Sequence, residues 1–285
     1  MSPLPNVRYR ITPSLLNSFQ RFLDLNTEEY WVQDSNGGWH KNYNEETGEY
    51  LVIPSKVEEL AEQELIDSIN RVPFVSEAAS KGTAFNEVVD SFLNGERSDK
   101  VQMRGDKTSD TIHTEIDGFN FDFSYRWTEE VVDYFKDSLT QVEVHAPLDT
   151  KYGKVELYGF IDYLRHNHVY DLKTTKNYTF GDHSKGWQKH VYPYALIESG
   201  MVTEVEDFEY TIYKWSGGTR MCPQLYGTQF REVYSYSHER TIGELRSVCE
   251  RFIEFLEMHR AVITDLKVFG GLYHTREEEM AAEAK

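Results

Sequence analysis

The chain has 285 residues, of which 39% are hydrophobic and 14% aromatic, a composition typical of a folded protein and not of a disordered one. Its net charge of -18 argues against a broad basic surface, so a nucleic-acid partner would require a local basic channel or metal ions that bridge carboxylates to phosphates. No apolar run approaches the roughly 18 residues of a membrane span, and the first residues lack the apolar segment of a signal peptide. We therefore expect a cytoplasmic protein with no membrane partner.

The N-terminal part predicts a helix followed by a small insertion. Thr12 is suited to cap the segment LLNSFQRFL, and Pro13 fits its first turn. Residues 30–53 hold Asn-Gly-Gly and Thr-Gly turn signals between aromatic segments, which predicts a hairpin insertion. Its aromatic residues could stack on nucleobases, but packing within the hairpin is the favoured interpretation; they are Trp31, Trp39, Tyr43 and Tyr50.

Two helices follow in the predicted order of elements. Residues 57–69 are amphipathic, and the pattern is broken at Val72-Pro73. Residues 81–96 carry an apolar stripe and should form a core helix that ends near Gly95. Asn86 and Asp90 lie four residues apart on one flank of it, a spacing that most often means two solvent-facing polar residues.

The segment from Val155 to Thr174 predicts a β-hairpin that organises the rest of the chain. Two stretches of aromatic and β-branched residues are separated only by His166-Asn167, which suit a two-residue loop. Counting back from that loop brings Asp162 opposite Asp171. Because side chains alternate along a strand, Lys173 lies on the same face.

Two carboxylates in that register repel one another unless a cation lies between them. Oxygen ligands beside a lysine suit Mg²⁺ or Mn²⁺ better than zinc. The alternative is a solvated strand face, because acid-x-Lys tripeptides also begin at Asp149, Asp265 and Glu283. Asp171 differs from these in lying in an apolar strand with a second acid opposite, which favours the metal.

The remaining elements complete a mixed α/β pattern. We expect strands around Asp117-Gly118 and over residues 141–146 and 205–215, and helices over 128–136, 184–200 and 239–269. In the helix over 184–200, Gln188 and Tyr192 share a face although Pro193 should kink it. We therefore expect one domain over 1–285 with its core at 80–215 and an acidic tail at 275–285.

Four motifs in this order resemble the RecB-like branch of the PD-(D/E)XK nuclease superfamily. They are GTAFNEVVD at 82–90, GFID at 159–162, DLK at 171–173 and QKHVY at 188–192. The resemblance covers roughly residues 80–215, with a weaker match at the N-terminal helix. It implies an α/β (α+β) fold of the restriction-endonuclease type, with a mixed central sheet flanked by helices.

The resemblance also implies a metal-dependent nuclease that cuts DNA with Mg²⁺ or Mn²⁺, such as an exonuclease of recombination, repair or phage DNA processing. Asp162 and Asp171 would ligate the metal with the Leu172 backbone carbonyl, and Lys173 would orient or deprotonate the attacking water. Further candidate metal ligands are Asp90, Asn86 and Glu87, and candidate nucleic-acid contacts are Gln188, Tyr192 and Thr174. A homo-oligomer or a recombination partner protein is expected beside DNA.

Two departures from the family pattern keep alternatives open. Asn86 stands where the family usually has His, and Asp90 where it has Glu, with Glu87 as a substitute. Cys222 and Cys249 are too few for the iron-sulphur cluster of some relatives, so no cluster is expected. The alternatives are a catalytically inactive DNA-binding or protein-interaction module, and a different metal hydrolase or carbohydrate-binding protein.

Overall fold

The computed structural model describes residues 4–34 and 37–270 of the chain. This part contains a mixed nine-stranded sheet and six α-helices, which confirms the expected α/β class. The helices are α1 (Pro13–Leu23), α2 (Pro54–Ile69), α3 (Glu77–Asn94), α4 (Tyr125–Tyr134), α5 (Gln188–Glu198) and α6 (His238–Met258), with a 3-10 helix η1 at Leu266–Phe269. Within the described ranges, none of these helices has the length and apolar character needed to cross a membrane.

The strands of the large sheet run in the order β1-β10-β11-β12-β13-β8-β7-β6, and β9 pairs with β10. Their bounds are β1 Tyr9–Ile11, β6 Gln102–Asp106, β7 Thr111–Ile116, β8 Phe119–Ser124, β9 Leu139–Thr150, β10 Gly153–Arg165, β11 His168–Thr175, β12 Asp207–Gly217 and β13 Leu225–Ser235. Two small two-stranded sheets pair β2 (Trp31–Gln33) with β3 (Trp39–Lys41) and β4 (Tyr43–Asn44) with β5 (Glu49–Tyr50).

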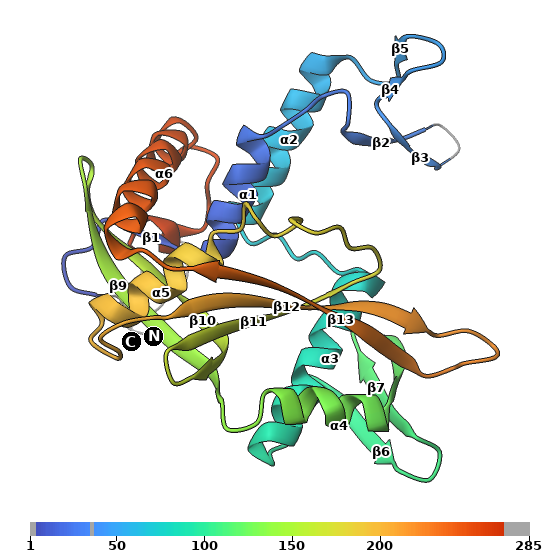
Figure 1. Cartoon of the computed structure of the whole chain (residues 1–285). Coiled ribbons are helices and arrows are strands. Elements are labelled where there is room, and N and C mark those ends of the chain that lie inside the picture. Colours follow the sequence, from blue (N-terminus) through green and yellow to red (C-terminus); the bar gives the residue numbers. More distant parts are fainter. Residues whose placement is uncertain (1–3, 35–36, 271–285) are drawn as a thin grey trace, which may run out of the picture. The chain divides into compact units, whose positions relative to one another are not determined.

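The chain divides into two compact units. The first unit comprises residues 1–72, 147–157 and 243–285, and the second comprises 73–146 and 158–242. The described part of the first unit begins at residue 4, lacks 35–36 and ends at 270. The tail predicted at 275–285 lies outside the described residues. In the first unit α1 and α2 lie side by side (Figure 1).

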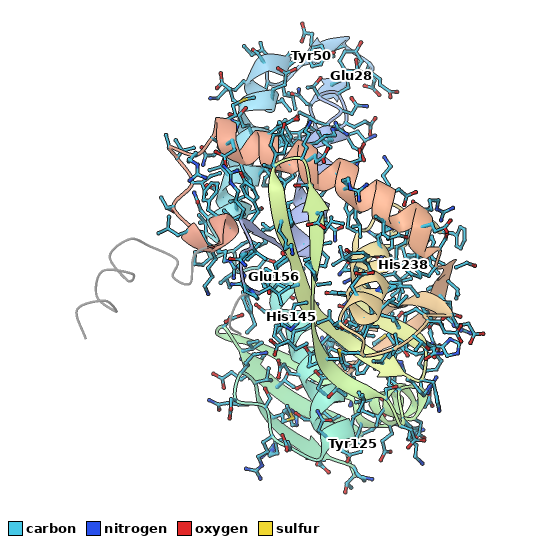
Figure 2. All side chains as sticks on the ribbon, turned by 90° about the vertical axis from the view of Figure 1, so that its left-hand side faces the viewer. Glu28, Tyr50, Tyr125, His145, Glu156 and His238 are labelled. Carbon is cyan, nitrogen blue, oxygen red and sulfur yellow. The ribbon has the colours of Figure 1, made fainter. Side chains whose placement is uncertain are left out.

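Helix α1 of the first unit begins as the sequence predicts. Thr12 caps it by accepting a hydrogen bond from the Leu15 amide, and Pro13 occupies its first turn. Phe19 packs against Phe252 of α6 with ring centroids 5.0 Å apart. Beside this core the β1 residue Arg10 donates to Glu156, labelled in Figure 2, at 2.6 Å, and both side chains are buried.

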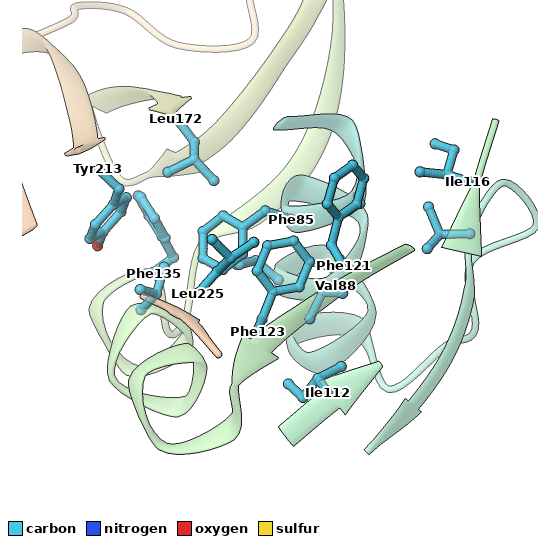
Figure 3. Close-up of a cluster of buried hydrophobic side chains, with 14 of the residues drawn as sticks. Phe85, Val88, Ile112, Ile116, Phe121, Phe123, Phe135, Leu172, Tyr213 and Leu225 are labelled. Atoms are coloured by element: carbon cyan, nitrogen blue, oxygen red, sulfur yellow. The ribbon is translucent and has the colours of Figure 1, made fainter. Parts of the chain in front are cut away.

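The second unit has an aromatic core built on α3. Phe85 stacks on Trp127 of α4 with ring centroids 4.6 Å apart. Its ring also lies 5.3 Å from the Phe123 ring of β8 (Figure 3). Ser76 caps the helix by accepting from the Ala79 amide, and Gly95 ends it with φ 68°. The predicted end at Gly95 is confirmed, although the helix begins four residues before Lys81.

Two of the expected helices have different bounds in the structure, and three strands were not expected. The C-terminal helix ends at Met258 and not at residue 269, because Asn70 holds the following segment: it donates to the Val262 carbonyl and accepts from the Thr264 amide. Helix α5 begins at Gln188 and not at Ser184. The strands β1, β6 and β13 were not expected.

The insertion at residues 30–53 forms two hairpins whose aromatic residues behave differently. Tyr43 and Tyr50 pack together with ring centroids 5.0 Å apart. Trp31 and Trp39 are 57% and 62% exposed, so the prediction that they pack within the hairpin is wrong. The alternating strand buries Val32 and leaves the tryptophans on its open face.

Candidate active site

The β10–β11 hairpin carries the two central carboxylates. Arg165 pairs with His168, Leu164 with Val169 and Tyr163 with Tyr170, so the loop is the predicted His166-Asn167. His166 has φ 55°, the left-handed conformation that such a loop needs. Continued by one residue, this register brings Asp162 opposite Asp171.

Asp162 is fixed by the strand next to it. Its Oδ2 accepts a hydrogen bond from the Leu172 amide at 2.8 Å, which brings the Leu172 peptide beside the carboxylate. Burial and then the Asp171 carboxylate raise the pKa of Asp162 to about 8, against the opposing effects of Lys173 and this hydrogen bond. Like charges this close to one another favour protonation of one partner or the arrival of a cation.

Asp171 is buried and held from two sides. Its Oδ1 accepts from Gln188 Nε2 at 3.0 Å, and its Oδ2 lies 2.5 Å from Lys173 Nζ. Burial alone would lower the pKa of Lys173, but the charges of Asp171 and Asp162 outweigh it and raise that pKa. Lys173 is therefore an ammonium ion at neutral pH in this arrangement.

Helix α3 carries two further buried oxygen atoms, and the charge of Asp90 acts on Asp162. Asn86 Oδ1 and Asp90 Oδ1 are buried and have no hydrogen-bond partner of good geometry among the described residues, although the Tyr163 hydroxyl neighbours Asp90. Asp90 Oδ2 accepts from Gln141 Nε2 at 2.9 Å. Burial raises the pKa of Asp90, and its charge in turn raises that of Asp162. The two residues are thus not the solvent-facing pair that their spacing alone favours.

Glu87 faces other partners. Its Oε1 lies 2.6 Å from Lys100 Nζ, and its Oε2 accepts from the Ser98 hydroxyl at 2.7 Å. The charge of Glu87 affects Asp90, but it is not among the neighbours that shift the pKa of Asp162. Of these two acids of α3, Asp90 is therefore the one whose charge acts on Asp162.

The predicted face of α5 also reaches the pair. Besides the Gln188 contact, Tyr192 is buried, and burial followed by the charges of Asp171 and Asp162 raises its pKa. Pro193 lies inside the helix without removing either residue from this face. Thr174 lies against α3, where a Cβ on Gly82 would come within 3.0 Å of its hydroxyl oxygen. The glycine of the first motif therefore permits close approach of helix and strand.

Two residues at this site were missed by the sequence analysis. Tyr210 of β12 pairs in register with Asp171, and its buried hydroxyl donates to Gln188 Oε1 at 3.4 Å. His183 lies with its ring 5.0 Å from that of Tyr210, and burial followed by Lys173 lowers its pKa. The alternation of residues 205–215 indicated a strand but not its pairing partner, so nothing in the sequence singled out Tyr210.

The donor atoms fit a hard divalent cation. Two carboxylates and buried side-chain oxygens without hydrogen-bond partners are the ligand types that Mg²⁺ and Mn²⁺ prefer. Among the described residues no three His, Cys, Asp or Glu side chains are grouped to hold an ion. Mg²⁺ does not require such a cage, because it is usually bound by one or two carboxylates together with water and substrate phosphates.

Comparison with known proteins identifies no family. No family model and no curated protein matches the chain. Among solved structures, the protein SSO0001 matches with a TM-score of 0.37 and 9% identity, covering 87% of this chain and 79% of that one. A protein from Eubacterium rectale named "Putative exonuclease" matches with a TM-score of 0.39 and 12% identity, over 71% of this chain and 75% of that one.

Proposed function

We propose that the chain is a divalent-metal-dependent nuclease that hydrolyses DNA phosphodiester bonds. The observation that carries the proposal is the grouping of Asp162, Asp171 and Lys173 on one hairpin, with the Asp171 carboxylate bound by Gln188. The Asp171 carboxylate raises the pKa of buried Asp162, so ionised Asp162 is costly to keep at this site, and a bound cation would offset that cost.

Asp162, Asp171 and the Leu172 carbonyl would hold the cation, with Asn86 and Asp90 contributing directly or through water. When bound, Mg²⁺ or Mn²⁺ lowers the pKa of a coordinated water and neutralises phosphate oxygens. The charge of Lys173 stabilises the negative charge that grows on the scissile phosphate and orients the attacking water. Gln188 holds Asp171 in place, and Tyr192 and Thr174 would contact the DNA strand.

The proposed role is that of an exonuclease in recombination, repair or phage DNA processing. A ring-shaped homo-oligomer or a recombination partner protein would keep DNA in a local channel and so reconcile the substrate with a net charge of -18. The second candidate is a catalytically inactive module of the same fold. It is favoured by Asn86 in place of the usual His and by the lack of a three-residue ligand group in the described residues.

The test is degradation of end-labelled linear duplex DNA, single-stranded DNA and RNA with Mg²⁺ or Mn²⁺, beside a chelated sample. Asp171→Asn and Lys173→Ala should lower the rate by about 10²-fold or more, since each removes charge from the reacting centre. Matched controls are Asp99→Asn and Lys176→Ala, which change exposed residues of the same types. Both controls should keep the activity of the unchanged protein.

Absence of cleavage by folded protein on all three substrates, with no metal binding by calorimetry, would refute the nuclease and leave the inactive module. Metal-dependent cleavage that survives Asp171→Asn would place the reaction elsewhere in the chain. Product ladders from the two labelled ends would give the polarity of an exonuclease, and internal fragments would indicate an endonuclease.

A further inference from the structure

The small sheet of β2 and β3 presents an unusual surface within the first unit. Its register pairs Trp31 with Lys41 and Gln33 with Trp39, so these four exposed side chains share one face. We call this set the tryptophan face. The two tryptophans are diagonal neighbours, a relation that separates the residues by about 7 to 8 Å. Two exposed indoles at this separation can both contact one extended ligand.

The other face of this sheet explains why the tryptophans point outward. Val32 is buried, and its partner His40 is hydrogen-bonded through Nε2 to Asp34 Oδ2 at 2.9 Å. The hairpin is therefore anchored by its Val32 side. The tryptophans contribute no comparable packing, because more than half of each side chain is exposed.

Charge around the tryptophan face distinguishes among possible ligands. Residues 28–50 include six carboxylates and one lysine. That lysine, Lys41, is already paired with Glu29. The excess of negative charge in these residues would repel the phosphates of a nucleic acid. A neutral oligosaccharide could donate hydroxyl hydrogen bonds to the carboxylates, but only a cationic ligand also neutralises their charge.

We infer that the tryptophan face is a docking surface for an arginine- or lysine-rich segment of a partner protein. A guanidinium group stacks on an indole ring through cation–π attraction and pairs with a carboxylate at the same time. The insertion offers both groups: the indoles on β2 and β3, and the exposed Glu45, Glu46 and Glu49 on the β4–β5 hairpin that follows. This inference does not depend on the proposed nuclease activity, and its test requires no catalysis.

The test is calorimetric titration of the full chain with a short peptide of alternating arginine and glycine. Trp31→Ala and Trp39→Ala should each weaken binding by about fivefold, as expected for loss of one cation–π contact. The double change to tyrosine should retain most of the binding, because a tyrosine ring also attracts cations. Circular dichroism and thermal unfolding would verify that each variant is folded.

A charge-matched pair of variants separates local docking from general attraction to an acidic protein. Glu45→Gln, Glu46→Gln and Glu49→Gln together remove three exposed charges of the β4–β5 hairpin that follows the tryptophan face. Glu96→Gln, Asp99→Asn and Glu204→Gln remove three exposed charges elsewhere. The first set should weaken peptide binding by about tenfold, and the second by less than about twofold. Equal loss in both sets, or no loss in the tryptophan variants, would overturn the inference.

Two further ligands test the alternatives at the same surface. An oligothymidylate and a neutral glucan oligosaccharide should not bind in a manner that depends on Trp31 or Trp39. Binding of either one that both alanine variants abolish would assign the surface to that class of ligand and overturn the basic partner.

Discussion

Asp90 carries its charge where the protein solvates it poorly. Burial is the main cause of its raised pKa, and the neighbouring Tyr163 hydroxyl and the hydrogen bond from Gln141 offset only part of that effect. The carboxylate also repels Asp162. A protein that retains such a charge loses stability in the absence of a cation, a loss that suits a binding site and not a structural one.

Asp90→Asn should therefore stabilise the metal-free protein at neutral pH, by about 1 kcal/mol. The folded pKa of Asp90 exceeds its ordinary 3.8, so its ionisation costs stability as the pH rises above that value. The difference in unfolding free energy between the two proteins should increase as the pH rises. It should disappear below pH 3.8, where Asp90 is protonated in both the folded and the unfolded state. Urea unfolding of both proteins with a chelator, at neutral pH and below pH 3.8, measures this difference in unfolding free energy. The exposed Asp99→Asn serves as the control. A difference that does not vary with pH would show that Asp90 is not electrostatically strained.

In the proposed site, Tyr210 is a positioning residue that acts through Gln188. The Tyr210 hydroxyl donates to Gln188 Oε1 at 3.4 Å, and Gln188 Nε2 donates to Asp171 Oδ1 at 3.0 Å. The tyrosine therefore orients the amide that binds Asp171. Tyr210→Phe should reduce kcat by about three- to tenfold with KM nearly unchanged, because positioning is lost while substrate contacts remain. Unfolding free energy should change by about 1 kcal/mol or less. The matched Tyr226→Phe, on the exposed surface of β13, should leave kcat as it is; equal effects of the two changes would argue against a positioning role.

At the scale of single elements, the sequence predicts structure well where local chemistry determines it. The His166-Asn167 loop fixed the register of β10 and β11, and Gly95 and Thr12 marked helix ends through their caps. The pairing of Tyr210 with Asp171 and the end of α6 depend on contacts between distant segments. No local residue preference encodes these, so the sequence alone left them open.

The turn before α5 provides an element-scale prediction. A Cβ on Gly186 would lie 2.3 Å from the Tyr210 hydroxyl, whereas a Cβ on Gly243 in α6 meets no atom within 4 Å. Gly186→Ala should destabilise the protein by about 1 to 3 kcal/mol because the start of α5 must shift. Gly243→Ala should stabilise it by up to about 1 kcal/mol through helix propensity. Urea unfolding of both variants measures this, and a Gly186→Ala protein as stable as the unchanged chain would show that the turn and Tyr210 adapt freely.

For the whole molecule, the charge of -18 bears on how DNA would be bound. Each lysine or arginine that neutralises a phosphate releases counterions and steepens the fall of affinity with salt, by about 0.9 in the log–log slope. The central lysine of the proposed site is already paired with Asp171. Binding that relies on bridging metal ions and a short basic channel therefore involves few such contacts.

We accordingly expect log kcat/KM for DNA cleavage to fall with log NaCl concentration at a slope of about -2 or shallower at fixed Mg²⁺. Measuring initial rates over a NaCl series gives the slope directly. The control is Lys176→Ala, an exposed lysine outside the proposed site, which should leave the slope unchanged. A slope near -5 or steeper would reveal an extended basic track and contradict binding through metal bridges. In that case the negative charge must be concentrated away from the DNA path, and the oligomer would have to be basic on its inner surface.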